Sequence, residues 1–327
     1  GLVLDAMEDR ERQALYRKIS YEIALSINRV SVVTPSALVA AAFLTQDRRE
    51  IRHDRWKAVL DTFRTYLASR RVPFAATFQE ADKAVSGALD IFLREQMITV
   101  DDAGRAPSGQ GETIYTLPGE KRLLIDYYKN MIIHYFLPLS FLSLSVLSRK
   151  EDSLPLGVIL EDYVFLKKLF RHEFIFDEEK NDEDEIREEL VYLADRGHID
   201  FEDGKAPQTV TVRGNGEEAL DAFAGLMRSY LESYWLVTRS VSLAGKEERE
   251  EKEWMKEIRR LGLQFHKDGE LRRYESLSQQ NFQGAIRFLA DTGLVSLTEK
   301  EARKFYRLSG APASLDEIRR RIFRFLH

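Results

Sequence analysis

The sequence has no cysteine in its 327 residues. Disulfide frameworks, thiolate metal sites and thiol nucleophiles are therefore excluded, and we expect a cytoplasmic protein because the cytosol keeps thiols reduced and rarely uses disulfides. An excess of positive charge is also missing, since 49 Lys and Arg stand against 54 Asp and Glu. The chain as a whole therefore does not attract nucleic-acid phosphates or anionic lipid, and such contacts would need a local basic patch.

Motifs of several common catalytic sites are absent as well. The sequence has no Gly-rich phosphate loop, Walker pattern, paired-His metal motif or Gly-x-Ser-x-Gly nucleophile elbow. We therefore name no catalytic, cofactor-binding or metal-binding residue and expect no cofactor. The sequence starts at Gly1 without an initiator Met, and its first residues do not have the charged and then apolar pattern of a signal peptide. This indicates an internal start or a trimmed chain.

What the sequence does contain is a pattern of helix, short hairpin and helix that occurs three times. The phrases IFLREQMITV, VYLADRGHID and IRFLADTGLVSL each pass from the end of a helix into an apolar strand. This pattern predicts a mostly α-helical scaffold with small β-hairpins and about three winged-helix-like units. We place them at residues 1–150, 151–245 and 246–327.

Local signals predict where several helices begin and end. Thr34 before Pro35 is a helix N-cap followed by proline at the first helical position. Thr77 and Glu80 have the spacing of a capping box, and Ser314 is expected to cap the last helix. Gly197 and Gly293 are expected to end helices that run directly into hairpins.

A winged-helix plan is compatible with a nucleic-acid reader or with a scaffold that only packs helices against small sheets. The first two expected wings each carry two acidic residues and one basic residue, namely Asp101, Asp102 and Arg105, and Glu202, Asp203 and Lys205. Because such wings would repel phosphate, we favour the scaffold and expect no nucleic-acid partner.

The most apolar stretch is Met131–Leu147, with 17 residues that carry no formal charge. It is shorter than the roughly 20 residues that cross a bilayer, and Pro138 divides it. One interpretation is a helical hairpin buried in the core, and the other is a lipid-facing surface or acyl-chain groove. The second would expose Met131, Ile132, Ile133, Phe136, Leu137, Phe141 and Leu144 to lipid, with headgroup contacts from Lys129, Arg149 and Lys150.

Four segments resemble one known family in the same order along the chain. They are YEIALSINRVSVVTPSALVAAAFL at 21–44, YYKNMIIHYFLP at 127–138, LFRHEFIF at 169–176 and RSYLESYWLV at 228–237. They are similar to the carboxy-terminal region of bacterial glycerol-3-phosphate acyltransferases, which follows the catalytic domain. Related dihydroxyacetone-phosphate acyltransferases share this region, so the acceptor stays open.

The resemblance implies that the catalytic His-x-x-x-x-Asp motif, in which His is the general base, lies upstream of Gly1. The bare spacing occurs here at His172 to Asp177 and at His198 to Asp203. A pattern of two residues is expected by chance, and His172 lies inside a segment that matches the carboxy-terminal region. We therefore transfer no catalytic role to either pair.

Two functions remain open. The resemblance implies a non-catalytic region of a glycerol-3-phosphate acyltransferase in phospholipid biosynthesis. It would support the catalytic domain in the same chain or in trans, meet acyl thioesters only through that domain, and associate peripherally with the inner face of the cytoplasmic membrane. The alternative is a stand-alone winged-helix-like protein that binds a protein or nucleic acid. Acyl donor and oligomeric state are left open.

Overall fold

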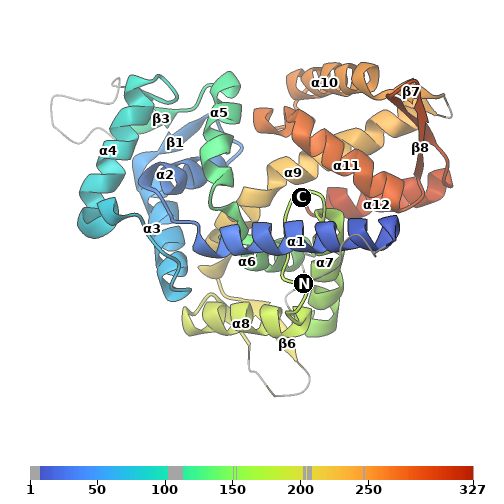
Figure 1. Cartoon of the computed structure of the whole chain (residues 1–327). Coiled ribbons are helices and arrows are strands. Elements are labelled where there is room, and N and C mark those ends of the chain that lie inside the picture. Colours follow the sequence, from blue (N-terminus) through green and yellow to red (C-terminus); the bar gives the residue numbers. More distant parts are fainter. Residues whose placement is uncertain are drawn as a thin grey trace.

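Helices form most of the molecule, and its strands form three small sheets (Figure 1). This computed structural model describes residues 8–101, 113–149, 151, 153–201, 204, 208–245 and 247–326. The predicted class, a helical scaffold with small β-hairpins, is confirmed.

Each sheet belongs to one repeat of the order helix, strand, helix, helix, strand, strand. The first repeat consists of α2 (Pro35–Leu44), β1 (Glu50–Arg52), α3 (His53–Ser69), α4 (Ala81–Arg94), β2 (Thr99–Asp101) and β3 (Ile114–Thr116). The second consists of α6 (Leu137–Leu147), β4 (Leu154–Pro155), α7 (Leu156–Leu169), α8 (Asp182–Asp195), β5 (Ile199–Asp200) and β6 (Thr209–Val212). The third consists of α9 (Gly216–Ala244), β7 (Arg249–Glu250), α10 (Glu251–Lys267), α11 (Gln279–Asp291), β8 (Val295–Lys300) and β9 (Arg303–Leu308).

The last strand of each repeat lies in the centre of its sheet and pairs antiparallel with the other two strands. In the first sheet, for example, Tyr115 lies opposite both Ile51 and Val100. All three predicted hairpins are present, and each has one strand more than predicted. The extra strands β1, β4 and β7 have only two or three residues, which is too short for an alternating apolar pattern to show in the sequence.

Three further helices complete the described part, namely α1 (Asp9–Val30), α5 (Gly119–Asn130) and α12 (Pro312–Arg324). Short 3-10 helices lie at η2 (Ala76–Glu80), η4 (Ile133–Tyr135) and η5 (Tyr274–Leu277). Figure 1 shows α1 crossing the front of the molecule, over α6 and α7.

The predicted helix ends are partly confirmed. The Thr34 hydroxyl accepts a hydrogen bond from the Ala37 backbone N–H at 3.2 Å, and Gly197 and Gly293 adopt left-handed φ angles of 71° and 73° after their helices. The capping box at Thr77 is wrong, because Thr77 lies in η2 and α4 begins at Ala81. The Ser314 cap is also wrong. Proline fixes the φ angle that a first helical residue needs, so α12 begins at Pro312 with Ala311 as its N-cap.

One hydrophobic core runs through all three repeats. Its central element is α9, which packs against α2, α3, α6, α10, α11 and α12. A Cβ atom on Gly225 of α9 would lie 2.2 Å from the Thr45 carbonyl oxygen, so only glycine lets α9 approach the end of α2 this closely. Each sheet falls within one of the ranges 1–150, 151–245 and 246–327, but α6 and α9 begin their repeats before residues 151 and 246. The division into those ranges stays a prediction.

Candidate functional site

The apolar stretch 131–147 forms η4 and α6, and it lies almost entirely inside the protein. Of the seven side chains expected to face lipid, six are buried, namely Ile132, Ile133, Phe136, Leu137, Phe141 and Leu144. Phe141 packs against Phe170 with ring centroids 5.9 Å apart, and Met131 alone of the seven is exposed. The expectation of a lipid-facing surface is therefore corrected, since buried side chains cannot meet lipid without leaving the core. No helix in the described ranges is long and apolar enough to cross a membrane.

The residues expected to contact headgroups are also engaged within the protein. Lys129 is buried and forms an ion pair with Asp126 at 2.6 Å. Arg149 Nε lies 2.9 Å from the fully buried Asp162 carboxylate. These two side chains stabilise buried carboxylates rather than face a headgroup layer. Lys150 lies outside the described residues.

Of the two His-x-x-x-x-Asp spacings, the one at His172 and Asp177 lies wholly within the described residues, and there the His does not meet its Asp. His172 contacts Asp291, whereas Asp177 forms an ion pair with Arg29 at 2.6 Å. Burial lowers the pKa of His198, and the neighbouring Asp200 pairs with Arg213. Asp203 lies outside the described residues. A base oriented by a carboxylate within the motif is therefore not formed at 172–177.

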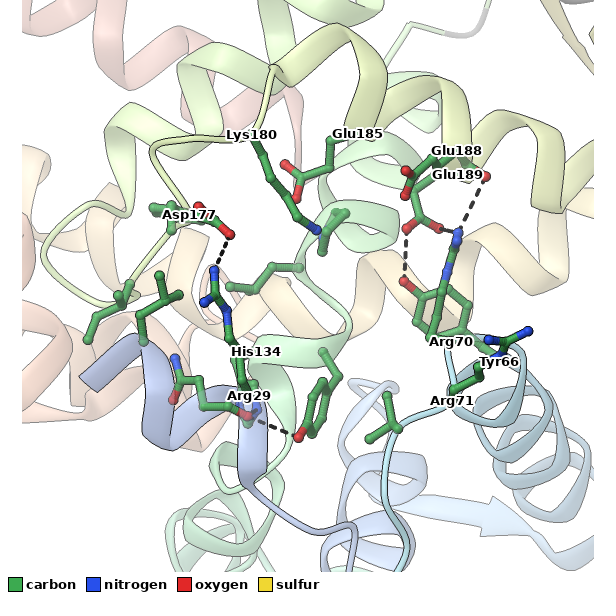
Figure 2. A pocket seen from close by; sticks show the side chains of 18 of the residues that line it. Arg29, Tyr66, Arg70, Arg71, His134, Asp177, Lys180, Glu185, Glu188 and Glu189 are labelled. Carbon is green, nitrogen blue, oxygen red and sulfur yellow. Dashed lines mark hydrogen bonds and ion pairs between the residues drawn. The ribbon is translucent and has the colours of Figure 1, made fainter. Parts of the chain in front are cut away.

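One candidate site is a cavity of about 590 Å³ beside the end of α1 (Figure 2). Six separate parts of the chain line it: the end of α1, the end of α3 with the loop to residue 73, η4 with the start of α6, α7, the 175–180 loop and α8. The sequence pattern gave no sign of this site, because its residues come from segments far apart in the chain.

A buried network forms one wall of the cavity. The Tyr66 hydroxyl donates to Glu189 Oε1 at 3.1 Å, and Arg70 Nη2 lies 2.7 Å from Glu189 Oε2. Burial outweighs the attraction of Arg70 and raises the pKa of Glu189 to about 7. Glu189 therefore changes charge close to neutral pH.

The other polar groups of the cavity are mostly paired with each other. The Tyr163 hydroxyl donates to Glu185 at 2.6 Å, and His134 Nε2 lies 3.1 Å from the Asn28 carbonyl oxygen. Burial lowers the pKa of His134 to about 4, so its imidazole is neutral at pH 7 and accepts no proton there. Figure 2 shows Lys180 extending from its loop toward the middle of the cavity.

Most of the polar side chains that line this cavity are held by other groups of the protein. The histidine is held against a backbone carbonyl, and the carboxylates of Asp177, Glu185 and Glu189 are paired with tyrosine or cationic side chains. In the described part of the chain, no group of three metal-ligating side chains is positioned to hold an ion.

Sequence reasoning missed Glu189 and its partners. The one available signal was the position of Glu189 on an apolar helix face, three residues after Ile186 and four before Leu193. A carboxylate at such a position needs a partner, but the sequence could not show that the partners were Tyr66 and Arg70.

Comparison with known proteins relates this chain to acyltransferases. A family model described as "Glycerol-3-phosphate acyltransferase C-terminal region" matches residues 4–298. Two relatives named "Putative acyltransferase plsB1", from Mycobacterium bovis and Mycobacterium tuberculosis (strain ATCC 25618 / H37Rv), are each 22% identical over 283 residues. Each match covers 85% of this chain and 44% of the relative, so the chain spans less than half the length of these relatives.

Proposed function

This chain belongs to the family of glycerol-3-phosphate acyltransferase carboxy-terminal regions, and we propose that it binds and supports an acyltransferase catalytic region without catalysing acyl transfer itself. The observation that carries the proposal is an exposed apolar stripe on α1. The proposed function would place the chain in phospholipid biosynthesis, where the catalytic region would bind the acyl thioesters.

The stripe runs along one face of α1 at helical spacing. It consists of Tyr16, Ile19, Ile23, Ile27 and Val30, which are between 46% and 72% exposed. None of the residues of α1 is buried, although the helix has six turns and many apolar side chains. A contiguous apolar face that is exposed on a protein surface marks an interaction site.

The opposite face of α1 is fixed to the body of the protein. The Phe176 backbone N–H donates to the Tyr21 hydroxyl at 3.1 Å, and Arg29 pairs with Asp177 at 2.6 Å. The carbonyl oxygen of Asn28 accepts hydrogen bonds from His134 and Tyr135. The helix is therefore held in place with its apolar stripe facing outward.

Two facts support a catalytic region as the partner. The family model describes a carboxy-terminal region, and the relatives have more than half of their length outside the match. If the match is carboxy-terminal in the relatives, as the description of the family model implies, the rest of their chain would lead into α1 (Asp9–Val30). The stripe is less suited to lipid, because it has no Trp or Phe and Glu22 lies exposed beside Ile23.

The proposal is tested with the purified chain and the acyltransferase catalytic region of the same organism. Sedimentation velocity measures their complex for the unaltered chain and for Ile23→Glu and Ile27→Glu. We expect each substitution to weaken the complex by about tenfold or more, because it places a charge in an apolar interface. The matched control is Leu243→Glu, which changes a leucine that is 68% exposed at the end of α9.

Three results would contradict the proposal. One is the absence of a complex with the unaltered chain, and another is a complex that survives both isoleucine substitutions. The third is that Ile23→Glu and Ile27→Glu bind anionic vesicles less well than the unaltered chain does but form the protein complex equally well. That result would identify the stripe as a membrane contact. Circular dichroism spectra of the variants show whether the fold is retained.

A further inference from the structure

A second cavity, of about 320 Å³, lies between the first repeat, α9 and the loop that precedes η5. Five arginines line it, namely Arg48, Arg55, Arg228, Arg272 and Arg273. The acidic residues in its lining are Asp47 and Asp221, and Glu232 outside the lining pairs with Arg273, which leaves an excess of two positive charges (five minus three). This local excess contrasts with the formal net charge of −5 for the whole chain.

Three of the arginines have acidic partners. Arg272 pairs with Asp47 at 3.1 Å, Arg228 with Asp221 at 2.6 Å, and Arg273 with Glu232 at 2.9 Å. Although burial opposes ionisation of Asp47, Arg273 and Arg272 hold its pKa below the usual value. These ion pairs fix the guanidinium groups in place around the cavity.

Donor capacity remains after these pairs are counted. Arg48 and Arg55 are exposed and have no acidic partner among the described residues. Their guanidinium groups are therefore the donors of the lining that an anion can reach without breaking an ion pair.

We propose that this cavity binds a phosphate group, carried either by a small polar molecule or by a lipid headgroup. Guanidinium groups bind phosphate oxygens through paired, charge-assisted hydrogen bonds. A phosphate near pH 7 is negatively charged and would neutralise the excess positive charge of the lining. Leu326 is the one apolar residue of the lining, so the cavity accepts a polar anion and excludes an acyl chain. The site is independent of the apolar stripe on α1.

Close backbone packing gives the cavity a rigid wall. Gly225 lies three residues before Arg228 in α9, and the absence of a side chain brings this helix against the Thr45 carbonyl. The contact sets the position of Arg228 relative to the 45–48 segment, which carries Arg48. A preformed set of donors loses little entropy when an anion binds.

The test uses the purified chain and inorganic phosphate, measured by calorimetry against chloride at equal ionic strength. We expect saturable phosphate binding and a rise in melting temperature with phosphate concentration. The double variant Arg48→Gln, Arg55→Gln should weaken binding by about tenfold or more, because it removes two charge-assisted donors from exposed positions where folding is not at stake. The control is Arg49→Gln, which makes the same chemical change at one exposed neighbour outside the lining.

A second measurement identifies the source of the phosphate. Vesicles of phosphatidylglycerol and of phosphatidylcholine are tested for flotation with the chain, with and without free phosphate. Binding to phosphatidylglycerol that free phosphate displaces, and that the double variant loses, assigns the site to a lipid headgroup. Binding of free phosphate alone assigns it to a soluble ligand. Absence of both, or equal binding by the unaltered chain and the double variant, overturns the proposal.

Discussion

The hydroxyl of Tyr66 donates to the Glu189 carboxylate at 3.1 Å, which joins the first repeat to the second across 123 residues of sequence. Arg70 lies on the same carboxylate, 2.7 Å from Oε2. A carboxylate that two repeats share, and that titrates near neutral pH, links the stability of the fold to pH.

Glu189 should make the protein less stable as the pH rises. Burial raises its pKa from 4.5 to about 7, so between these values the folded state holds a proton that the unfolded state has released. Stability from this group is therefore present below pH 4.5 and is lost as the pH rises through about 7. Glu189→Gln should flatten the pH dependence in this window, which urea unfolding at a series of pH values measures.

The matched control is Glu188→Gln, the same chemical change on the exposed residue beside Glu189. It should leave the pH dependence as it is. An equal slope for the unaltered protein and Glu189→Gln would mean that Glu189 does not titrate as described. Some slope should remain in Glu189→Gln, because burial also raises the pKa of Glu173 to about 7.

Gly225→Ala should destabilise the protein by about 1–3 kcal/mol, the range for overpacking a close contact. The added Cβ would lie 2.2 Å from the Thr45 carbonyl oxygen, and neither backbone can move without disturbing the core. Gly87→Ala is the matched control, since Gly87 is exposed in α4 and its added Cβ would meet no atom of a neighbouring element within 4 Å. That change should stabilise the protein by about 0.5–1 kcal/mol. Thermal unfolding that ranks the two variants the other way would refute the packing described for α9.

Phe141→Ala distinguishes a core segment from a lipid-facing one. The Phe141 side chain is fully buried and packs on Phe170, so its removal should cost about 3–5 kcal/mol. Met131→Ala, at a position 45% exposed in the same stretch, should change stability by less than about 0.5 kcal/mol. Chemical denaturation of both variants measures these changes. An unchanged unfolding midpoint for Phe141→Ala would mean that Phe141 is not in the core and that the stretch 131–147 can face lipid.

The chain by itself should show no acyl transfer from acyl-carrier-protein or coenzyme A thioesters. A general base must lie within hydrogen-bonding reach of the acceptor hydroxyl, whereas His172 contacts Asp291 and Asp177 pairs with Arg29. In an enzyme reconstituted with the catalytic region, His172→Ala and His198→Ala should each leave turnover near that of the unaltered chain. Turnover by the isolated chain that either substitution abolishes would reveal an active site at these histidines.

The sequence by itself determined those features that depend on near neighbours in the chain. The Thr34 cap and the left-handed turns at Gly197 and Gly293 follow from backbone chemistry within a few residues, and so do the hairpins after these turns. The error at Thr77 arose because a capping-box spacing can equally lie inside a 3-10 helix, and packing decides between the two.

The tertiary structure alone decided which apolar surface is covered and which charges meet. The segment 131–147 is more apolar than α1, yet α6 is enclosed by α7, α8 and α9 whereas the stripe of α1 faces outward. Hydropathy ranks segments by their preference for burial, but the folded chain determines which of them receive partners. The Tyr66–Glu189 contact and the arginine cavity likewise join residues from distant segments, and the electrostatic energy of each group depends on distances that exist only once those segments pack together.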